Sequence, residues 1–212
     1  MPSKKSIIVI GGGGHAKVVI SLIQRLGSFD LVGYTDMVDR GALLGLNCIG
    51  TDADLPNLKS TLGITSAALG IGMTGSTKAR EDVFALLAGL DIATPTLVAA
   101  SAVVSNDVHL GSGTLVSEGA VIQPGTSIGD AVIVNTQASV DHDCNIGDHV
   151  HIAPGAILSG GVNVGDRSLI GLGAKVLPGI TITSDTIVGA GATVTKNIEG
   201  SGTYVGSPAK KL

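Results

Sequence analysis

Residues 122–152 read IQPGTSIGDAVIVNTQASVDHDCNIGDHVHI, and every sixth residue of this segment, counted from Ile122, is Val or Ile. The same count continues in both directions along the chain. From Val98 to Val194, all seventeen positions at intervals of six are Val, Ile or Leu. At ordinary composition, each position would be one of these residues only about one time in four or five, so chance does not produce the run. The second half of the chain is therefore built from hexapeptide repeats.

Two further periodicities accompany the aliphatic column. Four residues after each aliphatic position stands a small or β-branched residue, such as Ala138 or Cys144. The Ile-Gly-Asp sequence of Ile128–Asp130 recurs eighteen residues later at Ile146–Asp148, and again, with Val in first place, at Val164–Asp166. Six residues per face and eighteen per turn predict a triangular parallel β-helix whose aliphatic column stacks along the axis. We expect the glycines of these corners to supply an unusual φ.

Residues 1–97 lack this repeat and instead alternate predicted strands and helices. Strands are expected at Ser6–Ile10, Leu31–Tyr34 and Ala67–Ile71, and helices at Ala16–Leu26 and Lys78–Ala88. Gly27 fits the C-terminus of the first helix. Because a β-α-β order places strands in parallel, we predict a parallel sheet covered by helices. The chain is therefore divided into domains at residues 1–97 and 98–212.

A glycine-rich segment follows the first predicted strand. The spacing Gly11-x-Gly13-x-x-Ala16, with Asp36 about twenty residues further on, matches a dinucleotide-binding fingerprint. Glycines allow the backbone to approach a phosphate at a helix N-terminus. Fewer than a hundred residues make only half of a dinucleotide fold, so a mononucleotide or a nucleotide sugar fits the size better than NAD. The alternative is a tight strand-to-helix turn that binds nothing.

Composition excludes several functional classes. The net charge of −4, the pI near 5.6 and the four aromatic residues are unlike a nucleic-acid-binding surface. No apolar run reaches the ~18 residues of a transmembrane helix, and Ile7–Ile10 is too short for a signal peptide. Two cysteines, Cys48 and Cys144, form no disulfide framework and fit a reducing compartment. We therefore expect a cytoplasmic protein without membrane insertion.

His142 stands between Asp141 and Asp143, outside the aliphatic and small-residue columns, so it should project from a corner. A carboxylate beside an imidazole orients it and raises its pKa, which suits a general base; a solvated corner turn is the alternative reading. His149 and His151 should also point outward. Their spacings of two and seven do not match the histidine pair of trimeric hexapeptide carbonic anhydrases, so no metal is expected.

Taken together, the chain resembles the bacterial sugar acetyltransferases that join a small Rossmann-like domain to a left-handed parallel β-helix. That group includes sialic acid O-acetyltransferases and N-acetyltransferases of UDP-4-amino sugars in bacillosamine and perosamine pathways. The resemblance spans essentially the whole chain and rests on Gly11–Lys17 (GGGGHAK), Asn135-Thr136, Ser139–Cys144 (SVDHDC) and Val205–Lys210 (VGSPAK). It implies an α/β N-terminal domain followed by a left-handed hexapeptide β-helix, a homotrimer, and sites in the clefts between solenoids.

The resemblance also implies roles at individual positions. His142 would be the general base, Asp143 would orient it in the place of a more usual Glu, and His151 would contact the acetyl group. Asn135 would lie near the acceptor sugar. Backbone groups of Gly160, Gly161 and Ala174 would meet coenzyme A, with Pro208 in the tail near its adenine. The nucleotide-sugar pocket would contain Gly12, Gly14, His15 and Asp36, with Met37 where a lysine often follows the acid.

We accordingly predict an acetyl-CoA-dependent N-acetyltransferase that acts on the amine of a nucleotide-linked 4-amino-4,6-dideoxy sugar. Transfer would be direct, within one ternary complex. The alternative within the same class is an O-acetyltransferase of a sialic-acid-like sugar. A non-catalytic scaffold is less well supported because the His-acid pair is intact. An NAD-dependent oxidoreductase is less well supported because the second half of the chain is a solenoid.

Overall fold

A computed structural model describes residues 4–73 and 76–212. The chain forms two compact units, and the change from one to the other falls between Leu97 and Val98. Among the described residues, no helix combines the length and the apolar character that a membrane span requires.

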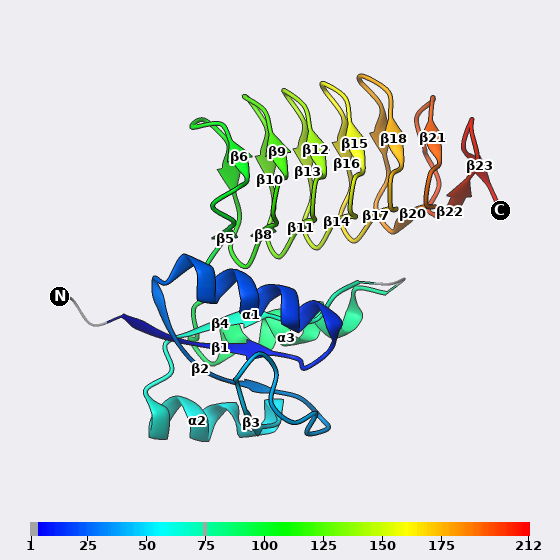
Figure 1. The fold of residues 1–212 in the computed structure, drawn as a ribbon. Coiled ribbons are helices and arrows are strands. Elements are labelled where there is room, and N and C mark those ends of the chain that lie inside the picture. Colours follow the sequence, from blue (N-terminus) through cyan, green and yellow to red (C-terminus); the bar gives the residue numbers. More distant parts are fainter. Residues whose placement is uncertain (1–3, 74–75) are drawn as a thin grey trace. The chain divides into compact units, whose positions relative to one another are not determined.

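The N-terminal unit is a four-stranded parallel sheet in the order β3-β2-β1-β4. Its elements in chain order are β1 (Lys5–Ile10), α1 (Gly14–Leu26), β2 (Phe29–Thr35), β3 (Cys48–Gly50), the 3₁₀ turn η1 (Asp52–Asp54), α2 (Leu55–Leu62), β4 (Ser66–Leu69) and α3 (Lys78–Gly89). Helices α1 and α2 lie on opposite faces of the sheet (Figure 1). Strands β2 and β4 lie on opposite sides of β1, so the strand order reverses there. The carboxyl ends of β1 and β4 therefore form a switch point, the place where α/β folds bind ligands.

Most of the elements predicted for this unit are present, with small changes at their ends. Helix α1 begins at Gly14 rather than Ala16, and it ends at Gly27, whose left-handed φ of 63° confirms the predicted C-terminal glycine. The short strand β3 and helix α2 were not expected from the sequence.

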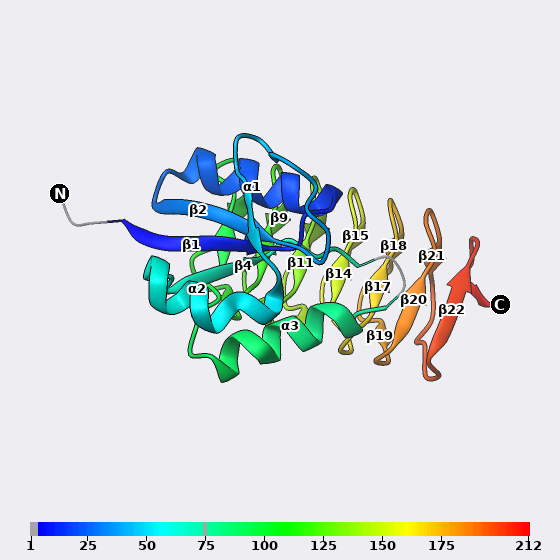
Figure 2. The same cartoon turned by 90° about the horizontal axis from the view of Figure 1, so that it is seen from below.

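The C-terminal unit is a left-handed parallel β-helix with three flat faces (Figures 1 and 2). The first face contains β5 (Leu97–Val98), β8 (Leu115–Val116), β11 (Ile133–Val134), β14 (His151–Ile152), β17 (Leu169–Ile170), β20 (Thr186–Val188), β22 (Gly202–Val205) and β23 (Lys210–Lys211). The second contains β6 (Val103–Val104), β9 (Val121–Ile122), β12 (Ser139–Val140), β15 (Ile157–Leu158), β18 (Lys175–Val176) and β21 (Thr193–Val194). The third contains β7 (His109–Leu110), β10 (Ser127–Ile128), β13 (Asn145–Ile146), β16 (Asn163–Val164) and β19 (Thr181–Ile182).

The two predicted columns form the interior of this solenoid. Strands pair with the strand eighteen residues away, as in the register Val134↔Ile152, so identical positions stack from coil to coil. From Val116 onward the aliphatic column is buried, and the small residues such as Ala138 and Cys144 are fully buried beside it. Each buried aliphatic side chain contributes about 1.5–3 kcal/mol, so stacking offsets much of the entropy lost on ordering the coils.

The corner between the third and first faces corrects one expectation. Gly129, Gly147 and Gly165 do not have a positive φ; they are absent from the left-handed residues, which at this corner include His149 and Arg167. A Cβ on Gly129 or Gly147 would instead collide with the aspartate carboxylate of the next coil. That carboxylate has a structural role, since Oδ1 of Asp148 accepts the N–H of Asp130 at 2.8 Å. These glycines are required by a close approach rather than by their φ.

Candidate functional site

The corner between β12 and β13 holds His142 against its neighbouring carboxylates. Nδ1 of His142 lies 2.8 Å from Oδ2 of Asp143, whose left-handed φ of 58° turns the short side chain back toward the ring. Oδ1 of Asp141 accepts the backbone N–H of His142 at 2.8 Å. The shorter side chain of Asp143 therefore reaches the imidazole directly, while Asp141 fixes the backbone beneath it.

The electrostatics of this corner favour a basic imidazole. The pKa of His142 is raised from its ordinary value, chiefly by the hydrogen bond to Asp143 and then by the charge of Asp141. Because the Asp143 carboxylate can only accept, Nδ1 carries the proton and Nε2 is left with its lone pair. The side chain of His142 is 61% exposed, so Nε2 is open to an incoming group.

The next coil presents bare backbone to this imidazole. Gly160 occupies the position eighteen residues after His142, and a Cβ on it would lie 2.5 Å from Cε1 and 2.6 Å from Nε2 of the ring. The N–H of Gly161 donates to the carbonyl of His142 at 2.9 Å. The N–H of Gly160 has no hydrogen-bond partner within the described part of the chain. A base and a vacant N–H donor therefore stand side by side.

Asn135 and His151 form a second polar cluster, on the first face. Nδ2 of Asn135 lies 3.0 Å from Nε2 of His151, and Oδ1 of Asn135 accepts the N–H of Thr136 at 2.8 Å. The amide nitrogen of Asn135 can only donate, so Nε2 of His151 is the acceptor in this hydrogen bond. His151 is only 9% exposed, so the expected outward-pointing surface histidine is in fact buried.

The structure does not bring these two clusters together within one chain. His142 lies at the corner between the second and third faces, whereas Asn135 directly follows β11 of the first face. Strand β12 of the second face and the turns on either side of it run between them. The fold therefore separates His142 from His151 by a whole face.

The other two positions assigned to coenzyme A lie apart from the His142 corner. Ala174 is fully buried, its N–H donates to the carbonyl of Gly171, and its carbonyl accepts the N–H of Ile157. Pro208 is exposed between β22 and β23, the antiparallel pair that ends the solenoid. Both assignments stay predictions.

In the N-terminal unit, a cavity of about 490 Å³ lies at the switch point. It contains all four residues predicted for the nucleotide-sugar pocket; the lining is Gly11, Gly12, Gly13, Gly14, His15, Asp36, Arg40, Gly70, Ile71 and Gly72. A Cβ at Gly13 or Gly14 would meet no atom within 4 Å, so the turn is open there. No side chain caps α1 and its first turn holds no acid, so the electrostatics of its N-terminus favour an anion.

Asp36 anchors this cavity. Its Oδ2 accepts the N–H of Gly12 at 2.7 Å and Nε of Arg40 at 3.1 Å, and its Oδ1 accepts the N–H of Val38 at 3.0 Å. Burial acts to raise the pKa of Asp36, but the donors from Val38, Arg40 and Gly12 outweigh it and hold the pKa below its ordinary value. Met37, in the place of the usual lysine, is 81% exposed.

Sequence reasoning missed two arginines near this cavity. Arg40 lines it directly, and a cation four residues after the acid was the available signal. Arg80 of α3 is buried, donates to the carbonyl of Ile71 at 2.8 Å, and has its pKa lowered by burial to about 9. No pattern in the sequence marked Arg80, because its burial depends on how α3 packs.

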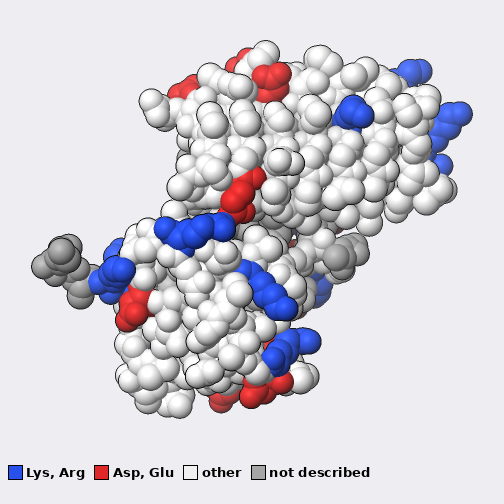
Figure 3. Space-filling model, in the orientation of Figure 1, with Lys and Arg blue, Asp and Glu red and all other residues white. Residues whose placement is uncertain are grey.

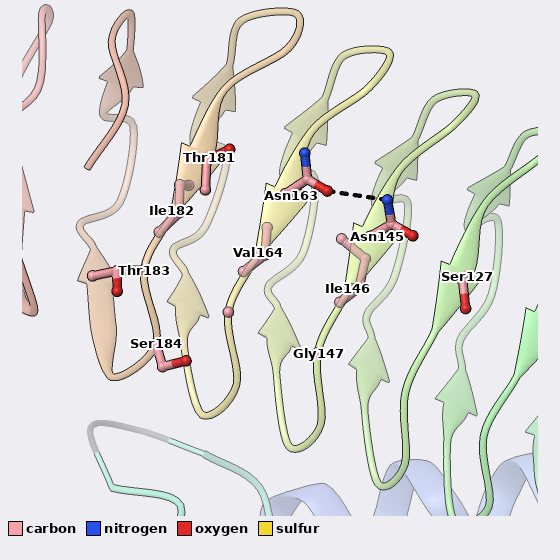
Figure 4. A pocket seen from close by; sticks show the side chains of 11 residues that line it. Ser127, Asn145, Ile146, Gly147, Asn163, Val164, Thr181, Ile182, Thr183 and Ser184 are labelled. Carbon is pink, nitrogen blue, oxygen red and sulfur yellow. Dashed lines mark hydrogen bonds between the residues drawn. The ribbon is translucent and has the colours of Figure 1, made fainter. Parts of the chain in front are cut away.

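A shallow groove of about 400 Å³ runs along the third face (Figure 4). Its floor is a column of polar side chains that includes Ser127, Asn145, Asn163 and Thr181. Nδ2 of Asn145 donates to Oδ1 of Asn163 at 3.0 Å. None of the predicted catalytic residues lines this groove. Within residues 4–73 and 76–212, no three His, Cys, Asp or Glu side chains lie close enough to hold a metal ion.

Comparison with known proteins identifies the family. The acetyltransferase domain of PglB from Neisseria gonorrhoeae is 37% identical, with a TM-score of 0.92, over 99% of this chain and 100% of that chain. Perosamine N-acetyltransferase from Caulobacter crescentus is 38% identical, with a TM-score of 0.92, over 98% of this chain and 97% of that chain. The protein belongs to the hexapeptide-repeat sugar acetyltransferases. The earlier resemblance is thereby confirmed.

Two further comparisons report what else this sugar acetyltransferase is similar to. Residues 6–87 match the family described as the PglD N-terminal domain. WeeI from Acinetobacter baumannii is 26% identical, with a TM-score of 0.88, over 99% of this chain and 100% of that chain. A search of curated proteins found no match.

Proposed function

We propose that this sugar acetyltransferase transfers acetyl from acetyl-CoA to the amine of a nucleotide-linked 4-amino-4,6-dideoxy sugar, with His142 as general base. The observation that carries the proposal is the corner at which Nδ1 of His142 meets Asp143 while Nε2 lies against Gly160. The relatives supply the substrate classes. The PglB domain was solved with acetyl coenzyme A, and the Caulobacter enzyme with CoA and GDP-perosamine.

The proposed chemistry is a single direct transfer. The amine attacks the thioester carbonyl as Nε2 of His142 takes one of its protons, and the carbonyl oxygen becomes an oxyanion. The vacant N–H of Gly160 would stabilise that oxyanion. The tetrahedral intermediate then collapses, the C–S bond breaks, and the proton on His142 passes to the departing thiolate to give CoA.

A covalent acyl-enzyme on cysteine has no support in this corner. Cys144 follows the His-Asp pair, yet it is fully buried and its Sγ donates to the carbonyl of Ser159 at 3.3 Å. Burial raises the pKa of its thiol, which disfavours the nucleophilic thiolate. The thiol is accordingly a packing group of the small-residue column.

Both clusters enter one site if copies of the chain associate as a trimer. The corner that carries His142 on one protomer would then face the Asn135–His151 cluster of another, which a single chain holds on a different face of the solenoid. Figure 3 shows a solenoid side with few Lys, Arg, Asp or Glu side chains, so little charge would be desolvated on association. The exposed Val103 and Ile157 of the second face supply apolar area for it.

An assay of thiol release tests the proposed function. Purified protein and acetyl-CoA are mixed with UDP- and GDP-linked 4-amino-4,6-dideoxy sugars and, in parallel, with free sialic acids. We expect CoA release with the nucleotide-linked amines and a product whose new acetyl group resists hydroxylamine, as an amide does. Turnover on sialic acid alone, with a hydroxylamine-labile ester, would replace N-acetylation by the alternative of O-acetylation.

A further inference from the structure

The loop after β2 is held in one shape by a buried tyrosine. Tyr34 is fully buried, and its hydroxyl donates to the carbonyl of Gly41 at 2.7 Å while it accepts the N–H of Arg40 at 3.2 Å. Burial raises the pKa of Tyr34, so the phenol keeps its proton and continues to donate. One hydroxyl therefore ties both residues at the end of the loop to the sheet beneath.

The Arg40 side chain leaves this loop toward the glycine-rich turn. Its Nε donates to Oδ2 of Asp36 at 3.1 Å, and that oxygen also accepts the N–H of Gly12 at 2.7 Å. A Cβ on Gly12 would lie 3.2 Å from Cδ of Arg40, so the arginine stem packs directly over the turn. Its direction is thus fixed by a charged hydrogen bond on one side and by close packing on the other.

The two terminal nitrogens of the Arg40 guanidinium are available to a ligand. The side chain is 51% exposed, and neither terminal nitrogen has a partner among the described residues. Of the described residues that line the cavity, Arg40 is the only lysine or arginine. Its guanidinium offers a pair of N–H donors to the cavity that the N-terminus of α1 also lines.

A cation is needed in this cavity to balance the charges of Asp36 and of a bound diphosphate. Asp36 and Arg40 cancel each other, whereas the diphosphate of a nucleotide sugar carries two negative charges. The N-terminus of α1 supplies only about half a positive charge. Without Arg40, the Asp36 carboxylate would face the diphosphate unneutralised.

We propose that Arg40 binds the diphosphate of the nucleotide-linked acceptor, and that Tyr34 and Asp36 are positioning residues that aim its guanidinium. The inference rests on the proposed function, because it takes the nucleotide sugar as the occupant of this cavity. It adds a cation that enters the cavity from four positions after Asp36.

Calorimetric titration of the full chain distinguishes a contact of Arg40 with the diphosphate from contacts with the nucleoside. UDP and GDP are compared with uridine and guanosine, on wild type, Arg40→Gln, Arg40→Lys and Tyr34→Phe. We expect Arg40→Gln to weaken nucleoside diphosphate binding about tenfold or more, with nucleoside binding nearly unchanged. Arg40→Lys should recover part of the loss, because it restores charge without the fork. Tyr34→Phe should weaken diphosphate binding alone, by a smaller factor.

Arg25→Gln is the matched control, since it removes the same charge from the last turn of α1, at the end opposite the cavity. It should bind nucleoside diphosphates as wild type does. Equal weakening of diphosphate and nucleoside binding by Arg40→Gln, or no weakening at all, would overturn the assignment while leaving a wild-type enzyme active on nucleotide sugars. If wild type binds no nucleotide and turns over no nucleotide sugar, the proposed function fails and this inference fails with it.

Discussion

The imidazole of His142 rests against Gly160, its counterpart one coil further along the solenoid, so closely that a Cβ on Gly160 would lie 2.5 Å from the ring. The corner proposed as the catalytic site is therefore made by two consecutive coils. One supplies the His-Asp pair and the next supplies bare backbone. This contact gives a specific reason for glycine at position 160, where φ is not left-handed.

Gly160→Ala should impair catalysis without unfolding the solenoid. The methyl group would push the imidazole aside, and a displacement near 1 Å can cost about 10²-fold in rate. The measurement is kcat together with the melting temperature. Gly89→Ala in α3, where a Cβ meets no atom within 4 Å, is the matched control and should leave kcat unchanged. A Gly160→Ala enzyme with normal kcat would remove the ring from the reaction.

Asp143→Asn should shift the acid side of the pH profile. A general base works only when neutral, so activity falls as the pH drops through the pKa of His142, which the hydrogen bond to Asp143 raises above 6.5. The amide removes that contribution, and the acid limb of kcat/KM should move to lower pH. Asp141→Asn should shift it in the same direction by less, since its charge is the second cause. An unmoved limb would mean that another group titrates.

A mixture of two inactive variants should recover activity if the site spans two protomers. His142→Ala and His151→Ala subunits, co-expressed in equal amounts, would form mixed trimers that each contain one intact pairing. Roughly a quarter of wild-type activity should return by random assembly. Each variant alone should stay inactive. No recovery in verified mixed trimers of two inactive variants would show that both histidines act from the same chain.

Asp36→Ala should weaken binding of the nucleotide-sugar acceptor without changing that of acetyl-CoA. The N–H of Gly12 and the guanidinium of Arg40 would both lose their shared oxygen, so we expect KM for the nucleotide sugar to rise about tenfold or more. The KM for acetyl-CoA should be unchanged, because the residues assigned to coenzyme A all lie in the solenoid. Unaltered acceptor kinetics would take this cavity out of the reaction.

The solenoid could be predicted from sequence because the residue pattern that specifies it is local and repeats every six residues. Each six-residue face repeats one aliphatic position, so Ile122 and Ile152 report the same geometry thirty residues apart. What the sequence could not show depends on contacts between coils or across loops. Position 129 requires glycine because a carboxylate from the next coil lies where a Cβ would be. The burial of His151 depends on the residues packed around it, which its own repeat does not specify.

The N-terminal unit shows the same limit. The glycine turn and Asp36 were recognisable from their spacing, and both line the cavity. Arg40 was missed: its spacing from Asp36 was a signal, but its place in the cavity depends on the loop that hydrogen-bonds to the Tyr34 hydroxyl. Helix α2 was missed as well; its eight residues bury only Leu55 and Leu58, which is too weak a periodicity to separate from a loop.

We propose His142 as the base of a direct acetyl transfer, and the His142→Ala variant tests that role. The variant should bind acetyl-CoA with wild-type affinity, because the relative from Caulobacter was solved with CoA and GDP-perosamine after replacement of a histidine by Asn or Ala. Its kcat on the nucleotide-linked amine should fall by at least about 10²-fold. A correctly folded His142→Ala enzyme that turns over at the wild-type rate would show that His142 is not the general base.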